Sequence, residues 1–280
     1  MSRDLVRRQF GANAANYVAS PVHAKGKSLD RLVTLTEPKS SWRVLDVATA
    51  TGHTAFAFAP HVASVVASDL TPEMLDQARA QADERNLTNV SFELADAEEL
   101  AFAADSFDLV TCRIAPHHFP DCGAFVDAVA RVLKPGGVFA LCDNISPDEE
   151  TPTARNADDA RASAVAYNAF EALRDPSHHR ALSTREWTDL CGKSGLEVRH
   201  LEFLDKAMAF NRWCDTMSVA SDTRESLRSD LAERESPLAS FIRPTPVAGD
   251  DIATADDIGF TLTELVLIAQ KPADVGARQT

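Results

Sequence analysis

The amino-acid sequence predicts an α/β protein built around a largely parallel sheet, and three observations support this prediction. Between residues 42 and 144, short apolar runs alternate with amphipathic helical patterns. The connections between them are short, as in βαβ units with right-handed crossovers. The chain has 280 residues, 45% of them hydrophobic and 25% charged, so it can bury the core that such a domain needs.

Five apolar runs account for the predicted parallel strands. They cover residues 43–48, 65–69, 90–96, 107–114 and 138–144. Helical patterns follow the first run, at 54–62, and the second, at 71–86, where Thr71 can act as N-cap before Pro72. A further helix begins near Cys122, and we expect Pro135-Gly136-Gly137 to stop it just before the fifth strand.

The pattern changes after residue 144, where polar, helix-prone sequence takes over. A helix is predicted at 159–175, and Ser183 with Glu186 forms a capping box that starts another. Strands are predicted at 196–205 and 259–272, separated by helical inserts. The predicted organisation is therefore as follows: N-terminal helices over 1–40, a core over 41–145, inserts with the last two strands over 146–272, and a flexible tail over 273–280.

Charge and cysteine content exclude several classes of function. The formal net charge of −14 repels phosphate backbones, so we expect neither a nucleic-acid partner nor an anionic membrane surface. The five cysteines are odd in number, widely spaced and without a CxxC pair, which favours free thiols over disulfides or a metal site: Cys112, Cys122, Cys142, Cys191 and Cys214. With no signal-peptide pattern and no long apolar window, the sequence predicts a cytoplasmic protein without a membrane span.

The stretch "LDVATATGH", residues 45–53, lies where nucleotide-binding α/β domains carry a glycine-rich turn. A GxGxxG pattern counted from Ala48 would end on His53, which would obstruct the close packing that its last glycine permits. A GxGxG pattern instead fits, with small residues at Ala48, Ala50 and Gly52. That spacing suits a ligand without a pyrophosphate, such as S-adenosylmethionine, and disfavours a nicotinamide oxidoreductase.

The second and third predicted strands each end in an acidic residue that suits the same ligand. Ligands of open α/β sheets bind beyond the carboxyl ends of the strands. Asp69 ends the second strand and can accept hydrogen bonds from both ribose hydroxyls. Asp96 ends the third strand and can accept one from the adenine amino group, while the Ala97 N–H donates to the ring.

Four motifs in this order carry a family resemblance: "VLDVATATGHTA", "VVASDLTPEMLDQA", "NVSFELADAEELAFAADSFDLVTCR" and "VARVLKPGG". The segment over 43–144 resembles the class I S-adenosylmethionine-dependent methyltransferases, most closely the UbiE/MenG-like branch. The resemblance implies a Rossmann-like seven-stranded sheet of order 3-2-1-4-5-7-6 with strand 7 antiparallel. The opening "FGANAANYVASPVHAKG" is similar to the lid helices of that branch.

The resemblance also implies which residues bind the cofactor. They are Asp46, Ala48, Thr49, Ala50, Gly52, Asp69, Leu70, Met74, Asp96, Ala97 and Arg113, with Tyr17 closing from the lid. Asp46 would orient the loop or contact the methionine end of the cofactor, and Arg113 begins the segment beside that end. Ala50 departs from the family's usual glycine, and at positive φ an alanine costs roughly 1 kcal/mol or more.

Methyl transfer is an in-line displacement that needs a base only where the acceptor must lose a proton. His117 and His118 in "RIAPHHF" follow the fourth strand and are the candidate catalytic residues. His23 in the lid is expected to serve helix packing rather than the site. The histidines of "DPSHHR", residues 175–180, are expected in a solvated turn, and no metal site is predicted.

The expected acceptor is a small molecule, either neutral or cationic because the protein is acidic: an aromatic, quinol-like compound or a secondary metabolite, methylated on O, N or C. A quinone-biosynthesis C-methyltransferase is one alternative. A non-catalytic S-adenosylmethionine-binding or interaction protein is another, motivated by Ala50. A homodimer is possible.

Overall fold

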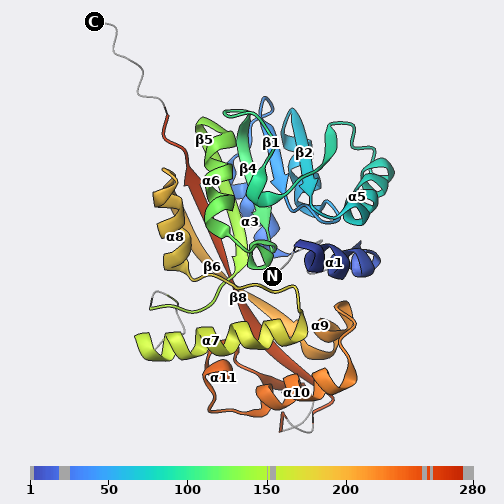
Figure 1. Cartoon of the computed structure of the whole chain (residues 1–280), viewed down its shortest axis with the longest axis vertical. Coiled ribbons are helices and arrows are strands. Elements are labelled where there is room, and N and C mark those ends of the chain that lie inside the picture. Colours follow the sequence, from blue (N-terminus) through green and yellow to red (C-terminus); the bar gives the residue numbers. More distant parts are fainter. Residues whose placement is uncertain are drawn as a thin grey trace, which may run out of the picture.

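The computed structural model describes residues 3–18, 26–149, 151, 156–247, 251–252 and 255–273, without the side chains of residues 12–18. Figure 1 shows two lobes along the long axis, with the sheet filling the upper lobe. The lower lobe carries mostly helices from the second half of the chain, and α1 lies beside the junction.

The sheet has the order β3-β2-β1-β4-β5-β8-β6, as predicted. Its strands are β1 (Arg43–Val47), β2 (Ser64–Asp69), β3 (Val90–Leu94), β4 (Phe107–Arg113), β5 (Leu133–Asn144), β6 (Glu197–Ala209) and β8 (Asp257–Gln270). β8 is antiparallel to both of its neighbours, which confirms the predicted antiparallel strand. A short strand that was not predicted, β7 (Thr245–Val247), pairs with β8 and makes the sheet eight-stranded.

Helices connect and flank these strands. They are α1 (Arg3–Val18), α3 (Lys27–Thr36), α4 (His53–Phe58), α5 (Pro72–Glu84), α6 (Cys122–Val132), α7 (Ala157–Arg174), α8 (Thr184–Lys193), α9 (Phe210–Thr216), α10 (Ser221–Ala232) and α11 (Pro237–Ile242). The predicted capping box of α8 is present. The end of α6 was predicted too late: the helix stops at Val132, because Pro135 disfavours helical backbone before it and Leu133 already belongs to β5.

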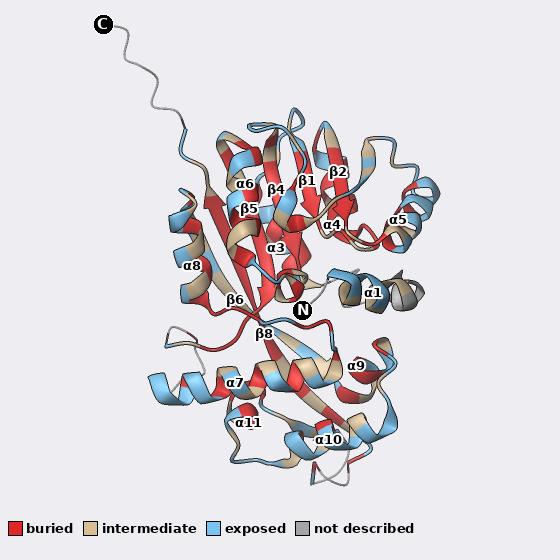
Figure 2. Cartoon of the chain, in the orientation of Figure 1, coloured by how far each residue is buried: buried red, intermediate tan, exposed pale blue. Residues whose placement is uncertain are grey.

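Hydrophobic clusters cover both faces of the sheet in the upper lobe. Phe125 and Val129 of α6 and Trp187 of α8 pack against one face. Leu32 of α3 and Ala78 of α5 belong to the cluster on the other face. The central strands are therefore buried on both sides, as Figure 2 shows, which explains why their sequences read as continuous apolar runs.

β8 belongs to both lobes, and its sequence changes pattern where it passes between them. Ile258, Phe260 and Leu262 alternate with less buried residues and pack into the cluster of the lower lobe, whereas residues 265–269 are continuously apolar and lie in the upper core. We call the lower lobe, formed by α7, α9, α10, α11, β7 and the adjoining parts of β6 and β8, the cap. In the part of the chain that is described, no helix is long and apolar enough to cross a membrane.

Candidate functional site

The loop after β1 places left-handed backbone at alternate positions. The φ angles are 53° at Ala48, 48° at Ala50 and 91° at Gly52. At Gly52 a Cβ would lie 2.3 Å from the Phe56 ring, so this position excludes any other residue. Ala48 and Ala50 adopt the same conformation with a Cβ, at a cost of about 1–2 kcal/mol each. The structure thus gives this turn the shape of a GxGxG loop with alanine at two of its three tight positions.

Asp46 at the end of β1 holds this loop from beneath. Its carboxylate accepts hydrogen bonds from Thr49 Oγ1 (2.6 Å), Thr111 Oγ1 (2.7 Å) and the Ala55 N–H (3.1 Å). Burial raises the pKa of the Asp46 carboxyl to about 6, although these hydrogen bonds and Arg113 act in the opposite direction. Of its two expected roles, this geometry favours orienting the loop.

Asp69 at the end of β2 joins the loop to the next connection. One carboxylate oxygen accepts from the Ala50 N–H (2.8 Å) and the other from the Thr71 N–H (2.9 Å). Burial raises the pKa of the Asp69 carboxyl, against the effect of these hydrogen bonds. Each oxygen keeps a further lone pair, and Asp69 lines a cavity above the sheet.

We call this space the first cavity. It comprises about 1030 Å³ not filled by protein, part of it open to solvent. The predicted site residues that line it are Ala48, Thr49, Ala50, Asp69, Leu70, Met74, Asp96, Ala97, Arg113 and His118. Asp46 and Gly52 do not line it and act on the loop instead. Tyr17 belongs to α1, but its side chain lies outside the described residues, as does all of His23.

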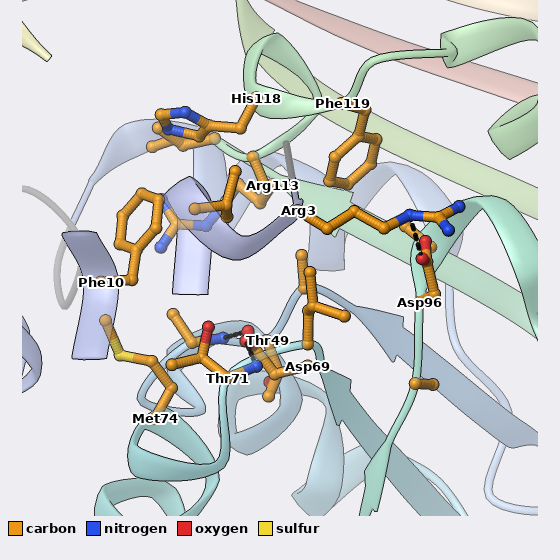
Figure 3. Close-up of a pocket in the computed structure, with 18 of the residues that line it drawn as sticks. Arg3, Phe10, Thr49, Asp69, Thr71, Met74, Asp96, Arg113, His118 and Phe119 are labelled. Atoms are coloured by element: carbon orange, nitrogen blue, oxygen red, sulfur yellow. Dashed lines mark hydrogen bonds and ion pairs between the residues drawn. The ribbon is translucent and has the colours of Figure 1, made fainter. Parts of the chain in front are cut away.

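α1 covers one side of the first cavity. The sequence predicted N-terminal helices there but did not indicate which of their side chains line the cavity. Arg3 Nε lies 2.5 Å from an Asp96 carboxylate oxygen (Figure 3). A second nitrogen of the guanidinium lies 3.1 Å from Glu98. Phe10 sits further along the helix, with its ring edge-on to His118 at 4.8 Å between centroids. The helix therefore spans from the Asp96 end of the cavity to the His118 end.

A second cavity lies between the core and the cap and shares Phe10, Ile114 and His118 with the first. His117 lines this second cavity and not the first. Its Nδ1 lies 2.6 Å from a carboxylate oxygen of Asp143, whose other oxygen accepts from the His117 N–H at 2.9 Å. Because a carboxylate only accepts, Nδ1 carries the proton and Nε2 is left as the proton acceptor.

The two neighbouring histidines have opposite electrostatic environments. Burial alone lowers the pKa of His117, but the charge of Asp143 and its hydrogen bond outweigh burial and raise it above 6.5. Burial, together with the adjacent His117, lowers the pKa of His118 to about 3. His118 is therefore neutral at pH 7, with its Nδ1 3.0 Å from the Ser177 carbonyl oxygen. Of the two candidates, His117 has the environment that favours proton uptake, as a general base requires.

The turn at 175–180 was expected in solvent, and this prediction is wrong for its centre. Ser177 and His178 are buried, and His178 lines the second cavity. The Asp175 carboxylate accepts from Ser177, and His178 Nε2 lies 2.9 Å from Asn168 Oδ1, so polar partners inside the fold replace water. Asp143 was not among the predicted site residues. It lies near the carboxyl end of the fifth strand, and ligands of open α/β sheets bind beyond such ends, so the rule used for the first four strands also indicates Asp143.

The residues that line the first cavity fit S-adenosylmethionine in their chemistry. The left-handed turns at Ala48 and Ala50 bring backbone to the cavity wall. Asp69 and Asp96 place acidic acceptors on that wall, where ribose hydroxyls and an adenine amino group would need them. Met74 adds a buried apolar surface for the base. A dinucleotide would need a third glycine where His53 begins α4.

Comparison with known proteins agrees with this fit. A family model described as a methyltransferase domain matches residues 38–194. The uncharacterized methyltransferase YcgJ of Bacillus subtilis is 34% identical over 222 residues, which are 79% of this chain and 83% of that protein. The crystal structure of YcgJ superimposes with a TM-score of 0.78 at 30% identity and covers 88% of this chain and 98% of YcgJ.

Two relatives with named activities match over shorter segments. The nocamycin O-methyltransferase of Saccharothrix syringae is 36% identical over 141 residues, 49% of this chain and 50% of that protein. The demethylmenaquinone methyltransferase of Deinococcus radiodurans is 42% identical over 104 residues, 36% of this chain and 42% of that protein. The site geometry and these matches together show that the chain belongs to the S-adenosylmethionine-dependent methyltransferase family.

Proposed function

We propose that this methyltransferase acts on a small-molecule acceptor and that His117 removes the proton from a phenol- or enol-type hydroxyl of that acceptor. The observation that carries the proposal is the His117–Asp143 pair, whose histidine lines a second cavity that shares lining residues with the first. The names of two relatives, a nocamycin O-methyltransferase and a demethylmenaquinone methyltransferase, support a small-molecule acceptor.

S-adenosylmethionine, when bound, supplies an electrophilic methyl group. Asp69, Asp96 and the loop at 48–52 hold the cofactor in the first cavity. His117 takes the hydroxyl proton on Nε2, and Asp143 holds the ring in the required tautomer and stabilises the imidazolium that results. Ile114 and His118, which line both cavities, form the passage at which the acceptor oxygen would meet the methyl group.

Quinol C-methylation is a second candidate, favoured by the demethylmenaquinone methyltransferase relative. The same base would serve it, since removing a quinol proton raises the nucleophilicity of the ring carbon. The position of the new methyl group, read by NMR of the product, separates O- from C-methylation.

Calorimetric titration tests the cofactor site. Wild-type protein should bind S-adenosylmethionine and S-adenosylhomocysteine, and Asp69→Ala should weaken both by about tenfold or more, because it removes the ribose acceptor. The same affinity in Asp69→Ala and wild type would show that the adenosine lies elsewhere.

The pH dependence of turnover tests the base. On a panel of phenols and quinols with radiolabelled S-adenosylmethionine, the rate should rise with pH through a pKa above 6.5, since His117 must lose its proton before it can act. Asp143→Asn should move that rise to lower pH and reduce the maximum rate, because it removes the charge that raises the His117 pKa.

His117→Gln should lower turnover about 100-fold or more while leaving the affinity for S-adenosylhomocysteine unchanged. His61→Gln, at an exposed position after α4, is the matched control and should behave as wild type. A pH profile that is the same in Asp143→Asn and wild type would exclude His117 as the base.

A further inference from the structure

We infer that the acceptor is an anion, held by cationic side chains of the cap, and this inference rests on the proposed function of the second cavity. Arg174 of α7, Lys206 of β6 and Arg212 of α9 all line this cavity. They come from three separate elements of the cap in a chain whose formal net charge is −14. The cavity thus departs from the acidic character of the whole molecule, from which a neutral or cationic acceptor was expected.

Arg174 and Lys206 are fixed in place by the fold. Arg174 donates from Nε to the Trp213 carbonyl oxygen at 3.2 Å, and its guanidinium lies over the Trp213 ring, 4.5 Å from the ring centroid. Lys206 Nζ lies 2.9 Å from a Glu264 carboxylate oxygen. Both side chains are largely buried, so their positions are set before an acceptor enters.

Arg212 differs from the other two because its charge is not compensated. Among the residues that the structure describes, no acidic side chain forms an ion pair with it. Asp215, one turn further along α9, pairs with Arg224 instead. An exposed guanidinium that lines a cavity and keeps its donors free can bind a carboxylate or phosphate through two parallel hydrogen bonds.

The acids in the same lining do not cancel this charge. Asp175 accepts hydrogen bonds on Oδ1 from Ser177 N–H (2.8 Å) and Ser177 Oγ (2.6 Å), which tie its side chain to the turn. Glu171 lies 3.7 Å from Arg174 and is its acidic partner. Glu264 pairs with Lys206. Arg212 is therefore the cation of this lining without an acidic ion-pair partner among the described residues.

These positions give the acceptor an orientation. Its reacting hydroxyl lies at His117, near the residues shared by both cavities, and its oxyanion lies at Arg212 on the cap. The substrate class is therefore a hydroxy acid with a phenol- or enol-type hydroxyl and a separate carboxylate or phosphate group. The shared chemistry is an oxyanion, and the two sources can be told apart experimentally.

The experiment uses three matched aromatic probes with the same hydroxyl: 4-hydroxybenzoate, 4-hydroxyphenyl phosphate and the neutral 4-hydroxybenzamide. Their binding to protein saturated with S-adenosylhomocysteine is measured by calorimetry. Binding of S-adenosylhomocysteine is measured before any acceptor is added. Absence of that binding would contradict the cofactor site, whereas normal cofactor binding without probe binding would contradict the anion site. Methyl transfer to each probe is measured in parallel.

Wild-type protein should bind at least one anionic probe about tenfold or more tightly than the amide, and the stronger anion identifies carboxylate or phosphate as the natural group. Arg212→Gln should abolish that preference, and Arg212→Lys should restore part of it. Arg185→Gln, which removes an equal charge from an exposed position on α8, should keep the preference.

Three outcomes would overturn the inference. They are equal or tighter binding of the amide, persistence of the anion preference in Arg212→Gln, and no binding of either anion to the S-adenosylhomocysteine complex. Thermal unfolding of each variant shows whether Arg212→Gln is folded, and the retained affinity for S-adenosylhomocysteine provides a second check.

Discussion

Alternate residues of the loop at 48–52 hold a left-handed backbone, and two of them are alanines. Such strain persists where surrounding contacts fix the conformation, and it concentrates at ligand sites. Here Asp46 fixes the loop through Thr49 and the Ala55 N–H, and Asp69 fixes it through the Ala50 N–H. The loop shape is therefore maintained by two buried carboxylates and not by glycine alone.

Ala50→Gly should raise the free energy of unfolding by up to about 1 kcal/mol, because glycine takes φ of 48° without a Cβ clash. Ala80→Gly, at an exposed position inside α5, should lower it by a similar amount. Urea unfolding of both variants measures the two effects. Destabilisation of the same size in both would show that Ala50 is not strained.

Asp46 should make stability depend on pH in an identifiable way. Its pKa is about 6 in the folded state and 3.8 in the reference state, so the folded protein binds the proton more tightly. The stabilisation from this group is complete below about pH 4 and is lost as the pH rises through 6, a difference of about 3 kcal/mol.

Urea unfolding of wild type and Asp46→Asn between pH 4 and pH 7 measures this effect. Over that range wild type should lose stability relative to Asp46→Asn. Asp189→Asn, at an exposed position on α8, should follow wild type. Parallel curves for Asp46→Asn and wild type would contradict a raised pKa.

At the scale of single elements, α1 links the two cavities. Arg3 at its start pairs with Asp96 beside the first cavity, and Phe10 lines both cavities. The Arg3 ion pair is partly exposed and contributes little stability by itself. Phe10, packed near Met74 and Met217 and against His118, is the more substantial contact. α1 therefore contributes more to enclosing the two cavities than to stabilising the sheet.

Phe10→Ala should raise the dissociation constant for S-adenosylhomocysteine about tenfold, equivalent to ~1.4 kcal/mol, because it opens the wall between the cavities. Leu5→Ala on the same helix is the control, since Leu5 is also half-buried but lines neither cavity. Calorimetric titration measures both affinities. Equal losses in the two variants would assign the effect to the helix as a whole.

At the scale of the whole molecule, the core and the cap share two long strands. β6 and β8 have 13 and 14 residues and pair over nearly their full lengths, so a ladder of roughly 45 Å crosses both lobes (Figure 1). Neither lobe can unfold without breaking that ladder. The second cavity, which needs residues from both lobes, is therefore held by a continuous hydrogen-bonded sheet and not by a flexible linker.

Scanning calorimetry should show one cooperative unfolding transition. S-adenosylhomocysteine at 100 times its dissociation constant should stabilise the protein by about 2.7 kcal/mol and shift that transition as a unit. Asp69→Ala at the same ligand concentration should shift less. Two separate transitions, of which the ligand moves only one, would show that the lobes are independent.

The sequence by itself determined the sheet order, through a family resemblance that rests on four ordered motifs, and the position of the loop at 48–52. These features are encoded locally, in apolar runs, turn residues and the ends of strands. The tertiary structure alone decided which groups work together. Asp143 reaches His117 across 26 positions of sequence, and Arg212 meets the same cavity from the cap. Such pairings depend on how β5, β6 and α9 pack, and the periodicity of a single segment carries no information about that packing.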